Sequence, residues 1–237
     1  IHVLEKESPS DNEKIQIDNV TLSGGIYNEI ALTNQNTAKL FFSGDATISG
    51  SINGNGKNVY VGENTLKFNS FNNLNVYVTN GSTLEYIGSN EDIVFNTLNY
   101  YEDGETVSPI SIKSLNNKKI FVDNFTGNFS DLILQGSIQL GSNWVTLNVN
   151  NLVVEENSTV TIPNPVELNV NKNLENKGNL LLETTQKNIT VNNFVNNGKV
   201  TQTGTLEING SFASGTDTSS TYSISSPSYS GSSGCSG

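Results

Sequence analysis

The sequence predicts an all-β fold: a right-handed parallel β-helix (solenoid) with short, irregular coils of about 20 residues. A loose repeat is the first observation, since Leu174 aligns with Phe194 at an offset of 20 residues and Val170 aligns with Val191 at 21. The second is that apolar and polar residues alternate over short segments, and none keeps the period of a helix. The third is that Asn, Gly and Ser punctuate these segments at close intervals.

The alternating segments define the strands in chain order. Most have three to five residues, which suits the coils of a β-helix better than the longer strands of a two-sheet sandwich. The expected strands are residues 39–42, 46–52, 58–61, 65–68, 75–78, 83–87, 110–112, 119–122, 132–134, 137–140, 145–149, 152–154, 159–162, 167–170, 179–182, 189–191, 199–201 and 205–208.

A second recurrence supports the solenoid. A small polar turn is followed by apolar residues at every second position, and we expect these to point inward and stack on their equivalents in adjacent coils. The inward pairs are Leu84 with Tyr86, Val160 with Ile162, and Leu206 with Ile208. Asn at the turns tolerates left-handed backbone and can form side-chain amide ladders, so a structural role accounts for most of the Asn.

One domain and a tail account for the length. Residues 1–213 are expected to form the β-helix, with the highly charged residues 1–20 as a polar cap over its first strand edge. Residues 214–237 are almost entirely Ser, Thr, Gly, Tyr and Pro without alternation. Such a segment buries little apolar surface, so we expect the flexible start of a stalk.

Charge excludes several partners. The net charge is -11, and all 12 basic residues are Lys, with no Arg in the sequence. Nucleic acids and anionic lipids both require basic protein surfaces, so neither is expected as a partner. No apolar run reaches the roughly 18 residues of a membrane span, and we expect no direct membrane insertion. The domain is expected to be monomeric.

The residues for catalysis are scarce. His2 is the only histidine and Cys235 the only cysteine, which excludes Ser-His-Asp and multi-histidine metal sites within this sequence. The acidic groups stand in predicted turns, and no calcium-loop spacing is present. We therefore predict no catalytic residue, no metal ligand and no cofactor. The alternative is a polysaccharide-processing β-helix enzyme, which would need carboxylates converging in one groove.

One loop and one tryptophan are the candidates for a ligand surface. Aromatic rings offer an apolar face with a polar tip, a combination that suits stacking on sugars. The predicted surface consists of Tyr100, Tyr101, Glu102, Asp103, Glu105 and Trp144. The competing interpretation is that Trp144 is buried in a coil and the tyrosines pack a loop.

Seven sequons permit N-glycosylation on a secreted chain. They lie at Asn19, Asn80, Asn124, Asn128, Asn157, Asn188 and Asn209. Their number is about what the Asn, Ser and Thr content produces by chance, so they do not demonstrate secretion.

The Asn-rich coils LENKGNLLLE and FVNNGKVTQTGTLEINGSF run directly into the Ser-rich tail. This pattern, over residues 145–213, resembles the N-terminal domain of fungal hyphally regulated cell-wall proteins, which include adhesin-like wall proteins of Candida yeasts. The resemblance implies a secreted, glycosylated protein, displayed on a stalk from the cell wall by a GPI-type anchor outside this sequence. It carries no functional residue over.

Two function classes follow. The first is a non-enzymatic cell-wall adhesin, or adhesin-like structural module, that attaches to extracellular surfaces or a host, with roles in biofilm formation and virulence. Carbohydrate or matrix protein would be its partner, bound through many weak contacts. The second is the polysaccharide-processing enzyme. Within the binding class, a bacterial autotransporter-type adhesin passenger is the runner-up.

Overall fold

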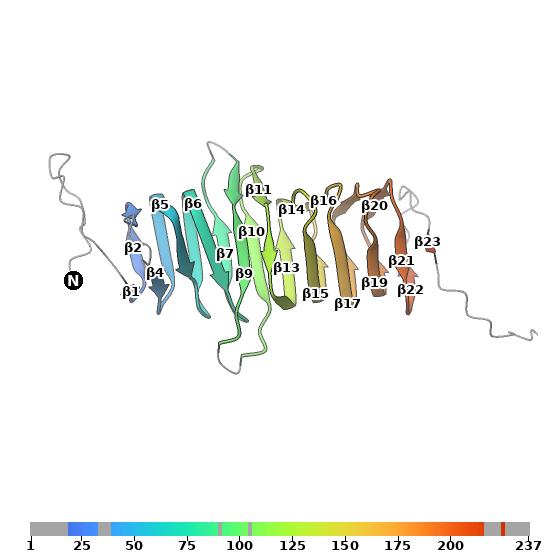
Figure 1. Cartoon of the computed structure of the whole chain (residues 1–237), viewed down its shortest axis with the longest axis horizontal. Coiled ribbons are helices and arrows are strands. Elements are labelled where there is room, and N and C mark those ends of the chain that lie inside the picture. The colour runs from blue at the N-terminus through green and yellow to red at the C-terminus, as the bar shows by residue number, and fades with distance from the viewer. Residues whose placement is uncertain (1–18, 33–38, 90–91, 104–105, 216–223, 226–237) are drawn as a thin grey trace, which may run out of the picture.

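The protein is a parallel β-solenoid of about nine turns, with coils about 20 residues apart. The computed structural model describes residues 19–32, 39–89, 92–103, 106–215 and 224–225. Strands are the only regular elements in these ranges, and they follow one another along a single long axis (Figure 1). The predicted all-β solenoid is therefore confirmed.

The strands vary in length because several of them continue around a corner of the coil. Their bounds are β1 Asn19–Leu22, β2 Gly25–Tyr27, β3 Ile30–Ala31, β4 Lys39–Phe42, β5 Ala46–Tyr60, β6 Thr65–Val78, β7 Thr83–Tyr86, β8 Ile93–Phe95, β9 Thr97–Tyr100, β10 Ile110–Ser114, β11 Lys119–Val122, β12 Phe125–Thr126, β13 Asn128–Gln135, β14 Ser137–Leu140, β15 Thr146–Val154, β16 Thr159–Ile162, β17 Glu167–Asn176, β18 Asn179–Leu182, β19 Ile189–Asn196, β20 Lys199–Gln202, β21 Leu206–Ile208, β22 Phe212–Ser214 and β23 Ile224–Ser225.

Each coil contributes to three stacked ladders, as the coil of β17 and β18 shows. The first ladder contains residues 167–170, which lie between the starts of β15 and β19. The second contains residues 173–176, after a register shift between Val170 and Asn173 that marks the corner. The third contains β18, which lies between β16 and β20. All of these pairings are parallel.

Alternation along the strands places one set of side chains inside all three ladders. Leu174 lies in register with Phe194, and neither side chain is exposed to solvent. The apolar residues predicted to point inward, Leu84, Tyr86, Val160, Ile162, Leu206 and Ile208, are all buried. Stacking like positions on one another removes apolar surface from water along the whole length, so the core is a continuous column.

The ends of the chain lie largely outside the described residues. Of the predicted cap at 1–20, only Asn19 and Val20 are described, and they begin β1, which pairs with β4. Of the predicted tail, Ser214 ends β22, and β23 pairs with β21 in the first ladder. Parallel pairing thus continues to Ser225.

Candidate functional site

Amide groups form hydrogen-bonded rows along the outside of the solenoid. In the second ladder Asn151 donates to the Asp131 carboxylate (2.6 Å) and Asn173 donates to Asn151 (2.8 Å). Asn193 then donates to Asn173 (3.2 Å), and the Ser211 hydroxyl donates to Asn193 (3.0 Å). We call Asp131, Asn151, Asn173, Asn193 and Ser211 the amide ladder. It joins five successive coils and uses the polar side chains that a ligand would otherwise meet.

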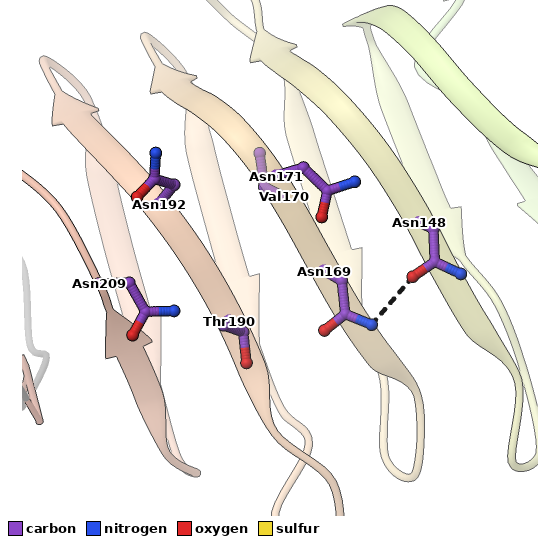
Figure 2. Close-up of a pocket in the computed structure, with 7 residues that line it drawn as sticks. All are labelled: Asn148, Asn169, Val170, Asn171, Thr190, Asn192 and Asn209. Carbon is purple, nitrogen blue, oxygen red and sulfur yellow. Dashed lines mark hydrogen bonds between the residues drawn. The ribbon is translucent and has the colours of Figure 1, made fainter. Parts of the chain in front are cut away.

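A shallow groove on the first ladder has a different character. Its lining residues lie on β15, β17 and β19 and directly after β21 (Figure 2). We define the Asn groove by its seven lining residues, Asn148, Asn169, Val170, Asn171, Thr190, Asn192 and Asn209. None of them carries a charge, and all but Val170 offer a polar side chain.

Only part of the Asn groove is tied up by internal hydrogen bonds. The Asn169 amide nitrogen donates to Asn148 Oδ1 at 3.0 Å and to Glu167 Oε1 at 3.1 Å (Figure 2). Farther along, the side chains of Thr190, Asn192 and Asn209 make no hydrogen bond to any described part of the chain. One half of the groove is therefore internally paired, and the other half presents unpaired donors and acceptors.

Trp144 is connected to the groove by a chain of contacts. The Lys187 ammonium lies 5.8 Å from the centroid of the Trp144 ring and 3.7 Å from Glu167 Oε2. Glu167 in turn accepts the hydrogen bond from Asn169. Trp144 is 65% exposed and sits at φ 55°, in the turn before β15. The predicted exposed aromatic is thus present and is linked to the groove residue Asn169 through Lys187 and Glu167, and the alternative of a buried Trp144 is wrong.

Aromatic residues also stack on the first ladder nearer the N-terminus. Phe41 and Tyr60 stack with centroids 4.6 Å apart, and Tyr60 and Tyr77 stack at 4.4 Å. Tyr101 packs edge-on against Tyr60 at 5.4 Å. Because stacked rings cover one another's faces, this row offers mainly ring edges to a ligand. We interpret it as a stabilising stack rather than a platform for sugars.

Burial within this stack affects two hydroxyl groups. Burial, together with the neighbouring Tyr60, raises the pKa of Tyr77 although Lys39 acts in the opposite direction. Burial and the Asp103 carboxylate raise the pKa of Tyr101 to about 12, although a hydrogen bond with the Gly62 backbone lowers it. Both groups are therefore neutral at physiological pH and act as hydrogen-bonding groups.

The loop predicted as a ligand surface is divided by the structure. Tyr100 is half-buried against the Phe129 ring at 5.8 Å, and Tyr101 belongs to the aromatic stack. Glu102 and Asp103 are exposed, and Glu105 lies outside the described residues. Trp144 lies two coils farther along the first ladder. It precedes the start of β15, whereas Tyr100 and Tyr101 stand at the end of β9 and just after it. The six residues therefore do not form one surface, and the groove residues were not predicted.

A second hollow on the second ladder contains carboxylates. It is lined by Pro109, Asp131, Leu132, Ile133, Asn151, Val153, Asn173 and Glu175. Asp131 accepts from Asn151, and Glu175 lies 3.8 Å from the Lys177 ammonium. Across the described ranges, no group of three or more His, Cys, Asp or Glu residues is placed to hold a metal ion.

The sequons differ in accessibility. Asn19, Asn124, Asn128, Asn157, Asn188 and Asn209 are exposed. Asn80 is half-buried: its amide donates to the Thr106 carbonyl at 3.0 Å, and its oxygen accepts from Ser130 and from Tyr100 at 3.5 Å. Six of the seven can therefore carry a glycan without loss of internal contacts of this kind.

Comparison with known proteins found no match, so a functional assignment must be argued from the fold and the groove. No family model matches the chain, and neither a curated protein nor a solved structure matches it. In the part of the chain that the structure describes, no helix is long and apolar enough to cross a membrane.

Proposed function

We propose that this protein is a non-enzymatic, extracellular adhesin or adhesin-like structural module that attaches a cell wall to other surfaces or to a host. The observation that carries the proposal is the Asn groove, an open, uncharged row of partly unpaired amide and hydroxyl groups on an extended solenoid. Such a surface offers many weak contacts and no reactive group. Biofilm formation and virulence would follow from attachment.

The shape of the molecule supports this role. Parallel pairing along the first ladder connects β1 to β23, so each coil supports its neighbours. A stiff rod holds a lateral binding surface away from its point of attachment. Weak contacts on such rods become effective when many copies are displayed together.

The enzyme alternative is supported by one feature, the two carboxylates of the second hollow. Asp131 and Glu175 both line it. Each carboxylate already has a partner, the Asn151 amide for Asp131 and the Lys177 ammonium for Glu175. A general acid and base must instead be free to exchange protons with a substrate. We therefore favour the binding module, either fungal or, as the runner-up, a bacterial adhesin passenger.

Attachment of protein-coated beads tests the proposal. Beads carrying the purified chain are expected to adhere to polysaccharide-rich wall preparations, epithelial monolayers or plastic under flow, and beads carrying the urea-unfolded chain are not. The same wall preparations are assayed for released reducing sugars. Release of sugar by the folded chain, reduced by Asp131→Asn or Glu175→Gln, would overturn the adhesin proposal in favour of the enzyme.

A further inference from the structure

We propose that the Asn groove binds a neutral polysaccharide chain lying along the solenoid axis, with Trp144 linked to the site through Lys187 and Glu167. This inference deepens the proposed binding function and rests on it. The groove crosses three consecutive strands of the first ladder, β15, β17 and β19, and reaches Asn209 directly after β21 in the fourth coil (Figure 2). Neighbouring strands are about 4.8 Å apart, close to the length of one pyranose unit in an extended chain. Successive sugars would therefore meet successive coils.

The hydrogen-bonding groups of the groove match sugar hydroxyls. An Asn side chain offers two hydrogen-bond donors and an acceptor, and a Thr hydroxyl can both donate and accept a hydrogen bond. The Asn148 and Asn169 pair has spent part of this capacity internally, whereas Thr190, Asn192 and Asn209 retain theirs. A polyhydroxylated chain can satisfy all three side chains at once. The unpaired half of the groove, on β19 and directly after β21, is therefore the principal contact region.

Charge around the groove selects a neutral ligand. No lining residue is charged. Glu207 lies in register with Thr190 at the side of the groove, and Glu167 lies at its paired end. The ammonium group of Lys187 is 3.7 Å from Glu167, whereas Lys172, the residue after Asn171, is exposed. Uronate or sulfate groups would meet two carboxylates, those of Glu167 and Glu207, against the exposed ammonium group of Lys172, so an anionic polysaccharide is disfavoured.

The backbone of the groove argues against a peptide ligand. Peptides that add to a sheet need unpaired backbone groups at an edge. Here β17 and β19 are paired in parallel on both sides, so their backbone groups are committed to the ladder. Recognition must use side chains alone, and those on offer are amides and a hydroxyl rather than apolar anchors.

Trp144 supplies the apolar component. Its ring is 65% exposed, and it is held through Lys187 and Glu167, the residue that contacts Asn169. A pyranose ring can stack on an indole face because its C–H groups are apolar. The sequon at Asn209 lies within the groove itself, so an N-linked glycan there would occupy the same space as the ligand.

Binding of defined oligosaccharides to the unglycosylated chain tests the proposal. Laminarihexaose, cellohexaose and mannohexaose serve as neutral probes, hexagalacturonate as the anionic probe and gelatin as the protein probe, with calorimetry and Trp144 fluorescence as readouts. We expect at least one neutral hexasaccharide to bind. Combining Thr190→Val with Asn192→Leu, which keeps volume but removes polarity, should weaken its association at least about tenfold.

The matched control is Asn72→Leu, at an exposed asparagine of the third ladder outside the groove, which should change binding by less than about twofold. Circular dichroism and urea midpoints establish that the variants are folded. Unchanged binding by the double variant, preference for hexagalacturonate, retention of gelatin alone or no neutral binding would each overturn the inference. Adhesion of coated beads to surfaces other than polysaccharide would meanwhile leave the proposed function standing.

Discussion

The ammonium group of Lys187 lies over the ring of Trp144, 5.8 Å from its centroid, although the two residues stand in different coils. Trp144 is the only tryptophan in the sequence, so tryptophan emission comes from this ring alone. We expect emission typical of an exposed indole, because 65% of the residue is accessible. Iodide should quench it efficiently because Lys187 attracts the anion.

Lys187→Ala should reduce quenching by iodide and leave quenching by neutral acrylamide unchanged. Lys118→Ala, at a residue in another coil, is the control. Equal loss of quenching by both agents would contradict the contact and indicate that Trp144 had become buried.

The amide ladder should contribute measurable stability at its centre. Asn173→Ala removes the bond donated to Asn151 and the bond accepted from Asn193. Because these groups are partly exposed, we expect a loss of about 1 kcal/mol in the free energy of unfolding. Asn171→Ala is the control, since its one bond to Asn150 is 3.4 Å long. Urea unfolding of both variants is the measurement, and equal effects would show that the ladder does not stabilise the coils.

Core stacking should dominate the stability of the C-terminal coils. Phe194→Ala removes a fully buried ring in register with Leu174, and we expect a loss of about 3–5 kcal/mol. Val195→Ala is the neighbouring control: Val195 is 38% exposed on the opposite face of the same strand, so the change should stay within about 0.5 kcal/mol. Denaturant unfolding checks both values, and similar losses would mean that the inside and outside of β19 are exchanged.

Ionisation of the Tyr101 hydroxyl should lower the free energy of unfolding at alkaline pH. Its pKa is raised to about 12 in the folded chain against 10.0 for the ordinary phenol, chiefly by burial and secondarily by Asp103. The folded state holds its proton more tightly, so the unfolded state binds fewer protons between these pH values. Stability from this group is therefore complete below pH 10 and falls as pH rises toward 12.

Tyr101→Phe should reduce the loss of unfolding free energy between pH 10 and pH 12. Asp103→Asn should lower the pKa of Tyr101 in an ultraviolet phenolate titration. Glu102→Gln changes the adjacent exposed carboxylate and serves as the charge control. A Tyr101 that titrates like an ordinary phenol would show that the ring is not held in the aromatic stack.

Asn80 should remain unmodified when the chain is secreted from a eukaryotic host. A glycan on its amide would displace the bond to the Thr106 carbonyl and disturb the contacts with Ser130 and Tyr100. Glycopeptide mapping of the folded protein should find the exposed Asn157 and Asn188 available and Asn80 bare. A fully occupied Asn80 in protein that unfolds cooperatively would falsify this placement.

Much of the register could be predicted from the sequence because buried apolar positions repeat at the length of a coil. The alignment of Leu174 with Phe194 and of Val170 with Val191 is the pairing in the structure. Some strands were missed where a polar residue points inward. In β9 Asn99 is buried, with its amide donating to the Val76 carbonyl at 3.3 Å, so the segment shows no clean alternation.

Corners were the second source of error. Residues 46–52 and 58–61 were predicted as separate strands, whereas Ala46–Tyr60 is one strand that continues through Asn55 and Gly56 at positive φ. Turn residues end a strand in most folds, but in a solenoid they bend it while pairing resumes beyond the corner. Composition does not distinguish these two outcomes.

The Asn groove could not be predicted because asparagine is abundant throughout the chain. Asn192 and Asn193 are adjacent, yet one side chain lines the groove unpaired and the other is part of the amide ladder. Which asparagine has a partner depends on the residue one coil away. The aromatic stack did leave a signal, since Phe41, Tyr60 and Tyr77 recur at intervals near the coil length.

The amide ladder begins at a carboxylate, and this gives it a direction. Asp131 can only accept hydrogen bonds, so Asn151 must turn its nitrogen toward it, and Asn173 and Asn193 follow in the same orientation. The aligned amide dipoles then add, with their positive end at the Asp131 charge, as the N-terminus of a helix does beside an acidic residue. Along this face the solenoid is electrically polar. Asp131 at one end and the backbone N–H of Ser211 at the other, which donates to Asn193 Oδ1 at 3.0 Å, set the same sense for the three amides between them.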